Sequence, residues 1–194
     1  MRRNYHKLGQ FELTGSDMRI SYPCYEKSTW CSGMISDCLP GRWDAAVSYL
    51  DEGKFSTRVA LLTAKHSEKV RSFALCNQFR ADDEYIYYQP GWKICNLSVG
   101  VDSGQAGIFD DAHYRDDHVF DGLPEAEHNF QAAWYNHCCD LTLSKQQAGV
   151  IPYGVVSSSG YGDGCYTALR HLNAAGKVDC IAVLFLSDQA QMPG

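Results

Sequence analysis

Short segments in which apolar and polar residues alternate follow one another along most of this 194-residue chain. A period of two is typical of half-buried β-strands. Turns rich in Gly, Asn and Asp separate the segments at short intervals, and this spacing favours an antiparallel β-sandwich or a partly open barrel over alternating βαβ units. The predicted strands are 10–14 paired with 18–21, 43–50 followed across a turn by 58–62, then 72–78, 85–88, 95–101, 149–158, and 165–173 paired with 177–186.

The segment from Val178 to Leu186 is apolar on both faces. We therefore expect a central strand, covered by a sheet on one side and by a helix on the other. One helix is predicted, over residues 124–141, because proline favours its first turn and Glu125 and Glu127 complement the helix dipole. Its apolar face comprises Phe130, Ala133, Trp134, His137, Cys138 and Leu141.

These elements predict a mainly β (α+β) fold with one amphipathic helix packed on the sheet. Residues 1–194 contain no internal repeat, linker or low-complexity tract, so we interpret them as a single domain. The composition agrees, because 45% hydrophobic and 21% charged residues are ordinary for a globular protein.

Composition and charge also exclude several classes of protein. The longest apolar run, 180–186, is far shorter than the roughly 20 residues that span a bilayer. The basic start of the chain has no apolar region behind it, so we expect no secretory signal, no membrane partner and a cytoplasmic location. The formal net charge of −6 argues against broad nucleic-acid binding.

The chain has nine cysteines, an odd number, which together with the lack of an export signal predicts reduced thiols. Cys24, Cys31 and Cys38 lie seven residues apart. Structural zinc sites usually contain a ligand pair two to four residues apart, so we interpret these three as small buried side chains.

Two glycine-dense segments, 100–107 and 157–164, each follow a β-rich stretch. Glycines at alternating positions permit left-handed backbone angles, and successive N–H groups can then form a concavity that binds an anion. Serine hydroxyls and aspartates add donors and acceptors, so the segments suit a phosphorylated or sugar-like ligand. The alternative is ordinary turn chemistry. The candidate ligand-binding residues are Asp102, Ser103, Gly104, Gln105, Ser158, Ser159, Gly160, Tyr161, Gly162 and Asp163.

The combination of residues 101–110 and 157–166 resembles the C-terminal hallmark of a family known as domain of unknown function 4241, found in bacteria and their viruses. Residues 20–25 are similar to the Asp-Pro-containing start of such proteins, although Tyr22 stands where Asp is expected. The resemblance implies no activity, because none is assigned to the family. It marks as positions of interest Asp102, Ser103, Gln105, Ser159, Tyr161, Gly162 and Asp163.

A further candidate is the segment 110–121, which contains five aspartates and two histidines. Carboxylates suit Mg, Ca or Mn and imidazoles suit Zn or Ni, so Asp110, His113 and His118 are candidate ligands for a divalent metal. No EF-hand loop is present, because its sixth position lacks glycine. The alternative is a solvated acidic loop in front of the helix.

We predict a small-molecule binding protein that sequesters an anionic or nucleotide-like ligand, in a setting of conflict between bacteria and phage. Binding is favoured over turnover because no nucleophile, base and orienting group occur at a recognised spacing. One alternative is a metal-assisted hydrolase that uses Asp102, Asp110, His113 and His118. Another is an immunity or interaction protein that acts through a surface. No cofactor other than a divalent metal is expected.

Overall fold

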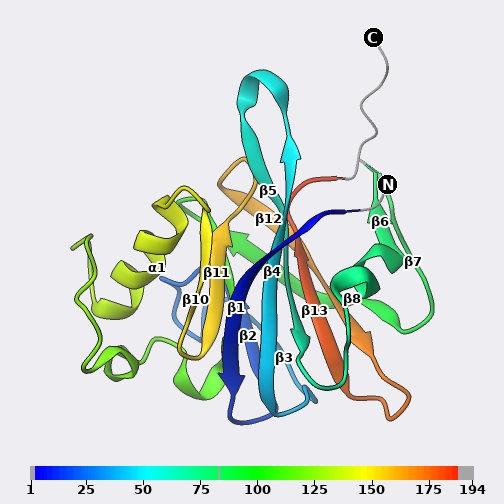
Figure 1. Cartoon of the computed structure of the whole chain (residues 1–194), viewed down its shortest axis with the longest axis horizontal. Coiled ribbons are helices and arrows are strands. Elements are labelled where there is room, and N and C mark those ends of the chain that lie inside the picture. The colour runs from blue at the N-terminus through cyan, green and yellow to red at the C-terminus, as the bar shows by residue number, and fades with distance from the viewer. Residues whose placement is uncertain (1–2, 83, 188–194) are drawn as a thin grey trace.

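Two antiparallel β-sheets stack face to face (Figure 1). The computed structural model describes residues 3–82 and 84–187. The six-stranded sheet has the order β1 (Tyr5–Leu13), β4 (Gly41–Asp51), β5 (Thr57–His66), β13 (Val178–Leu184), β12 (Gly164–Leu172) and β8 (Trp92–Val101). The five-stranded sheet has the order β10 (Ala148–Ile151), β11 (Gly154–Ser158), β9 (Gln105–Asp110), β2 (Met18–Ser21) and β3 (Gly33–Ile35). A separate ribbon pairs β6 (Phe79–Ala81) with β7 (Ile86–Tyr88).

One apolar core lies between the two sheets. Leu62 and Val183 of the six-stranded sheet are fully buried in it. Ile20 and Ile108 of the five-stranded sheet belong to the same cluster and are equally buried. The predicted sandwich is therefore confirmed, and in the described part of the chain neither sheet closes into a barrel.

The central position predicted for the last strand is confirmed, because β13 lies between β5 and β12 and every one of its residues is buried. The hairpins β4–β5 and β12–β13 also form. The prediction that the main helix covers the second face of β13 is wrong. Cys180 and Ala182 instead pack with Cys76, Phe79 and Ala81, which come from a short 3-10 helix, η2 (Phe73–Gln78), and from β6.

The strand expected at 72–78 is thus also wrong, since these residues form η2. The Ser72 hydroxyl accepts a hydrogen bond from the Ala74 amide and caps the first turn. The buried residues of η2 are Phe73 and Cys76, three positions apart, which is the repeat of a 3-10 helix and not of a strand.

The hairpin predicted between 10–14 and 18–21 does not form. Both segments are strands, but β1 pairs with β4 in one sheet, while β2 pairs with β3 and β9 in the other. The chain therefore crosses between the two sheets at 14–17. Alternating residues show that each strand is half buried, but they do not identify its partner.

The predicted helix is shorter than expected. It is α1 (Ala133–Leu143), and residues 124–132 precede it as irregular chain. Asp117 Oδ1 accepts from the Trp134 amide and satisfies the first turn of α1 from a distant segment. Asn136 Oδ1 accepts from the amides at 130 and 131 and stabilises the irregular approach. Side-chain bonds of this kind replace the helical turns that Pro124 was expected to start.

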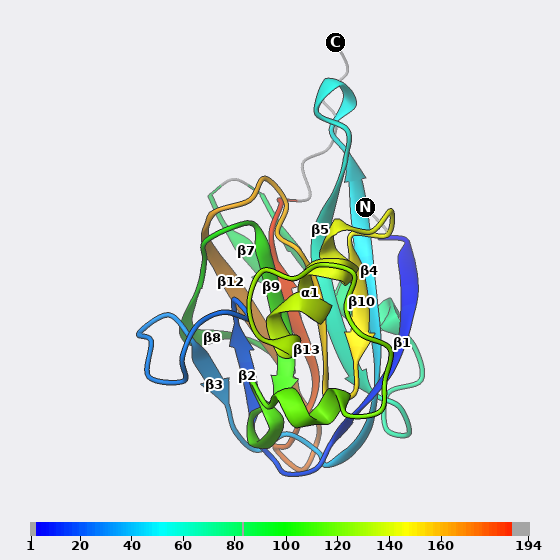
Figure 2. The ribbon, with the colours of Figure 1, turned by 90° about the vertical axis from the view of Figure 1, so that its left-hand side faces the viewer.

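The packing of α1 on a sheet is confirmed, but the sheet is the five-stranded one. Trp134 and Cys138 of α1 are buried against Phe109, Ile151 and Val156 from β9, β10 and β11. Figure 2 shows α1 in front of these strands. Of the helices in the described part of the chain, none has both the length and the apolar character that a bilayer crossing requires.

The β4–β5 hairpin extends beyond the rest of the sandwich (Figure 2). Three more 3-10 helices lie between strands: η1 (Gly53–Phe55), η3 (Asp111–His113) and η4 (Asp117–Phe120).

All nine cysteines are free thiols. Cys31 and Cys38 are buried, as expected for small apolar side chains, whereas Cys24 is only partly buried and its thiol donates to Gln131 Oε1 at 3.3 Å.

Replacing Leu62 with Ala should destabilise the protein by about 3 kcal/mol, because it leaves a cavity between the two sheets. The free energy of unfolding, measured by urea denaturation, tests this. Ile94→Ala in β8 of the same sheet is the control, with an expected cost of about 0.5 kcal/mol or less, because Ile94 is 44% exposed. Equal costs for the two variants would contradict the assignment of the core.

Candidate functional site

The two glycine-dense segments lie side by side, each where the chain crosses from one sheet to the other. The first connects β8 to β9 and the second connects β11 to β12. Because β9 pairs with β11 and β12 pairs with β8, the two crossings meet at one corner. The Ser103 amide donates to Asp163 Oδ1 at 2.7 Å, and the Ser159 amide donates to the Gly104 carbonyl at 3.0 Å.

These crossings require unusual backbone angles. The φ values are +77° at Ser103 and +76° at Gly104 in the first segment. They are +58° at Gly160 and +115° at Gly162 in the second. Positive φ has little steric cost for glycine, so the glycines are explained by the sharp change of direction alone.

Several backbone amides that were expected to be free for an anion instead donate to groups within the two segments. The amides of Ser103 and Ser159 bind across the corner, and the Gly162 amide donates to the Ser159 carbonyl at 2.9 Å. The Tyr166 hydroxyl donates to the carbonyls of Ser159 and Gly162 and closes the second segment further. Three of the donors proposed for an anion are thus already paired within the protein.

The side chains of Gln105 and Ser158 point to the helix and not to solvent. Gln105 is buried, and its amide oxygen accepts from the Thr142 hydroxyl of α1 at 3.3 Å. The Ser158 hydroxyl donates to the Thr142 carbonyl at 3.1 Å. Both residues therefore attach α1 to the five-stranded sheet. By contrast, Asp102 is exposed, as is Tyr161, whose hydroxyl donates to Glu52 on the β4–β5 hairpin.

Three hydroxyl groups meet beside the corner. Tyr22 Oη lies 2.7 Å from Ser103 Oγ and 2.8 Å from Tyr135 Oη, and the last two lie 3.3 Å apart. Burial raises the pKa of Tyr22 well above its ordinary value, so its hydroxyl stays neutral. Each hydroxyl can donate to one neighbour and accept from another, so the cluster joins the segment after β2, the β8–β9 crossing and α1.

The candidate metal ligands Asp110, His113 and His118 do not come together. Asp110 is buried and accepts from the Thr14 amide at 2.8 Å and the Thr14 hydroxyl at 2.6 Å. His113 stacks on Tyr153, with ring centroids 3.8 Å apart. His118 is exposed and lies 3.2 Å from Asp121. Among residues 3–82 and 84–187 there is no group of three or more His, Cys, Asp or Glu side chains that could hold a metal ion.

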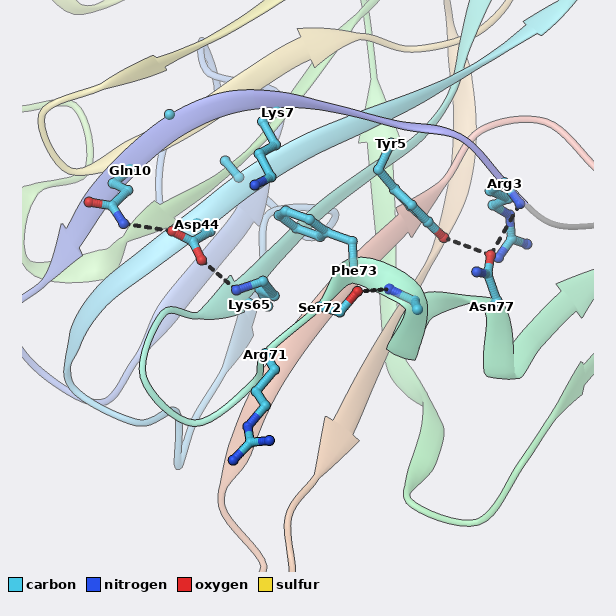
Figure 3. Close-up of a pocket in the computed structure, with 13 residues that line it drawn as sticks. Arg3, Tyr5, Lys7, Gln10, Asp44, Lys65, Arg71, Ser72, Phe73 and Asn77 are labelled. Carbon is cyan, nitrogen blue, oxygen red and sulfur yellow. Dashed lines mark hydrogen bonds and ion pairs between the residues drawn. The ribbon is translucent and has the colours of Figure 1, made fainter.

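Sequence reasoning missed a pocket of about 550 Å³ on the outer face of the six-stranded sheet (Figure 3). It lies between β1 and the segment 71–77, with β4 and β5 at its base. A β-bulge in β1 between Lys7 and Gly9 shifts the register, so Lys7 faces outward while Phe11 and Leu13 still face the core. The lining residues are Arg3, Tyr5, Lys7, Gly9, Gln10, Asp44, Ala45, Lys65, Arg71, Ser72, Phe73, Ala74 and Asn77.

An ion pair between buried Lys65 and partly buried Asp44 lies at the base of this pocket. Lys65 forms a salt bridge with Asp44 and donates to the Val70 carbonyl at 2.7 Å. Asp44 also accepts from Gln10 at 2.7 Å and from Ser67 at 3.1 Å. Burial alone raises the pKa of Asp44, but the hydrogen bonds from Lys65 and Gln10 outweigh it and hold the pKa below its ordinary value. Asp44 is therefore a carboxylate at neutral pH.

Positive charge dominates the lining. Four cationic side chains, Arg3, Lys7, Lys65 and Arg71, face one carboxylate, Asp44, in a chain whose net charge is −6. Arg3 donates to the carbonyls of Cys76 and Phe79, and Lys65 is paired as described. Lys7 and Arg71 are exposed, and their side chains have no hydrogen-bond or ion-pair partner among the described residues. They lie 64 positions apart, so no motif could reveal them. The one local signal is Lys65, a charged residue directly after the mostly apolar segment 59–64.

A model of the family described as protein of unknown function (DUF4241) matches residues 32–183. The chain belongs to this family. The match confirms the resemblance noted from the two glycine-dense segments, which both lie within it. No curated protein and no solved structure matches the chain. The DUF4241 family is described as one of unknown function, so the match assigns no activity to the chain.

Asp110→Asn in this DUF4241 protein should lower the free energy of unfolding by about 2 kcal/mol, because an amide cannot accept from all three donors around Asp110. Thermal and urea denaturation measure the loss. The control, His118→Asn, should change stability by about 0.5 kcal/mol or less, because His118 is exposed. If Asp110 instead held a metal, a chelator would destabilise the wild type and not D110N, and this result would contradict the structural role.

The contribution of Asp44 to stability should depend on pH. Its folded-state pKa lies below the ordinary value of 3.8, so ionised Asp44 stabilises the fold above that pH. The difference in unfolding free energy between wild type and Asp44→Asn should be full at pH 7 and shrink as the pH falls below 3.8. Urea denaturation across this range measures it. A difference that stays constant, or grows, on acidification would contradict the prediction.

Proposed function

We propose that this protein binds a small anionic molecule, of the size of a nucleotide or phosphorylated metabolite, in the pocket between β1 and the segment 71–77. The observation that carries the proposal is that Lys7 and Arg71 line this pocket and their side chains have no partner among the described residues, while Arg3 and Lys65 add positive charge. The pocket volume of about 550 Å³ falls within the range of small-molecule sites, roughly 300–1,000 Å³.

The chemistry of the lining suits a phosphate group beside an apolar ring. Lys7 on β1 offers a mobile point charge, and Arg71 on the other side offers a planar fork that binds two phosphate oxygens at once. The rings of Tyr5 and Phe73 stack on each other with centroids 5.7 Å apart and form an apolar wall (Figure 3). A base or other flat group can pack on that wall while the phosphate meets the cations.

Binding fits this pocket better than turnover. Its thirteen lining residues include two hydroxyl groups, on Tyr5 and Ser72, but neither histidine nor cysteine. The Tyr5 hydroxyl donates to Asn77. The Ser72 hydroxyl is already the cap of η2. The metal-assisted hydrolase loses its geometric basis, because Asp110, His113 and His118 point to different neighbours.

We place this binding in the cytoplasm, a reducing compartment where the nine free thiols would persist. In a conflict between bacteria and phage, such a protein would act by sequestering a signalling nucleotide. The positive pocket in a negative chain supports this role, because it would attract an anion while the rest of the surface repels it.

Isothermal titration calorimetry with inorganic phosphate, AMP, ATP and a panel of cyclic nucleotides tests the proposal. At least one phosphorylated compound should bind, and the affinity should fall as salt is added. The double variant Lys7→Glu/Arg71→Glu should weaken this binding by about tenfold or more, because each lost charge-assisted hydrogen bond contributes roughly 1.5–3 kcal/mol.

The matched control is Lys93→Glu/Lys145→Glu, which reverses two exposed lysines outside the pocket. It changes the net charge of the protein equally and should leave the affinity within about twofold. Absence of heat from every compound would overturn the proposal. An equal loss in the control variant would overturn the location.

A further inference from the structure

A second cavity, of about 560 Å³, lies against α1 and shares no lining residue with the pocket of Figure 3. It is bounded by α1, by β10 and by the irregular chain at 120–128. Carboxylates and apolar side chains dominate its lining, in contrast to the cationic pocket. The lining residues are Phe120, Leu123, Pro124, Glu125, Glu127, His128, His137, Asp140, Leu141, Leu143, Ser144, Val150, Ile151 and Pro152.

The walls of this cavity are mostly hydrocarbon. Leu141 of α1 and Ile151 of β10 form one side, and Phe120 forms another, with its ring stacked on His137 at 4.1 Å. Leu123 and Leu143 at the opening are 50% and 63% exposed. Exposed apolar side chains that converge on a cavity are typical of a binding site for an apolar group.

The charged groups that line the cavity are mostly negative. Glu125, Glu127 and Asp140 contribute three carboxylates, and the fourteen lining residues include neither lysine nor arginine. Glu125 and the side chain of Glu127 have no hydrogen-bond or ion-pair partner among the described residues. Their charge is therefore not compensated by the protein.

His128, another lining residue, is held in one orientation by Asp140. Its Nδ1 lies 2.5 Å from Asp140 Oδ1, and Asp140 also accepts from the amides of Glu127 at 2.7 Å and His128 at 2.9 Å. Burial favours neutral Asp140, but the hydrogen bonds from His128 outweigh it and keep the pKa of Asp140 low. A carboxylate at Nδ1 places the proton of neutral imidazole on that nitrogen, which leaves Nε2 as a hydrogen-bond acceptor.

We propose that this cavity binds a small hydrophobic amine. The ammonium group donates to Glu125, Glu127 and Nε2 of His128, which together offer acceptors only. The aromatic or alkyl body packs against Phe120, Leu141 and the other apolar walls. A neutral molecule of the same shape leaves the carboxylates uncompensated, and an anion is repelled, so the charge of the lining selects the amine.

The probe is 4-phenylbutylamine, with 4-phenylbutanol and 4-phenylbutanoate as neutral and anionic analogues of the same length. Binding is measured on the full chain at pH 7.5 by calorimetry and by chemical-shift changes of α1 amides. The amine should bind about tenfold or more tightly than the alcohol, and the carboxylate should not bind. Equal affinity for amine and alcohol, or no binding of the amine, would overturn the proposal.

Two variants locate the site. Glu125→Gln/Glu127→Gln removes both uncompensated charges and should abolish the preference for amine over alcohol. The control Glu68→Gln/Glu84→Gln removes two exposed carboxylates elsewhere and should leave the preference intact. Preference retained in the first variant would overturn the site. Lys7→Glu/Arg71→Glu should still bind the amine, so failure at one pocket is distinguishable from failure at the other.

Discussion

The structure depends on the burial of one apolar core between two antiparallel sheets. The chain contributes strands to the two sheets in turn. The chain passes from one sheet to the other after β1, β3, β8 and β11, so each sheet is completed only when the other forms. At the β8–β9 and β11–β12 crossings, Ser103, Gly104, Gly160 and Gly162 take positive φ. The two glycine-dense segments are thus, first of all, corners of a sandwich.

Two cavities of similar size and opposite charge follow from how the outer faces of the sandwich are covered. On the six-stranded sheet, η2 covers β13 with Cys76, and the pocket remains between this cover and β1. On the five-stranded sheet, α1 covers β10 and β11, and the second cavity remains between α1 and the chain at 120–128. Each cavity therefore lies beside a covering element and outside the shared core.

Local patterns predicted much of the fold. Alternation located most strands and the sandwich class, and the two-sided apolar run identified β13 as central. The errors arose where distant side chains decide local structure. Asp117 caps α1 from sixteen residues before its first residue. The segment 73–78 forms η2 and not a strand, with Cys76 packed against β13 and Phe73 stacked on Tyr5 of β1. The predicted partner of β1 was wrong for the same reason, since its true partner, β4, is distant in the sequence.

For the candidate site too, some features followed from the sequence and others only from the tertiary structure. Sequence alone determined that the class is mainly β and that Cys31 and Cys38 are buried, because composition and period are local properties. Only the tertiary structure decided that the segments consume their own amides and that Asp110, His113 and His118 diverge. It alone assembled Lys7 and Arg71 into one pocket, because a β-bulge and a 3-10 helix from different parts of the chain set their directions.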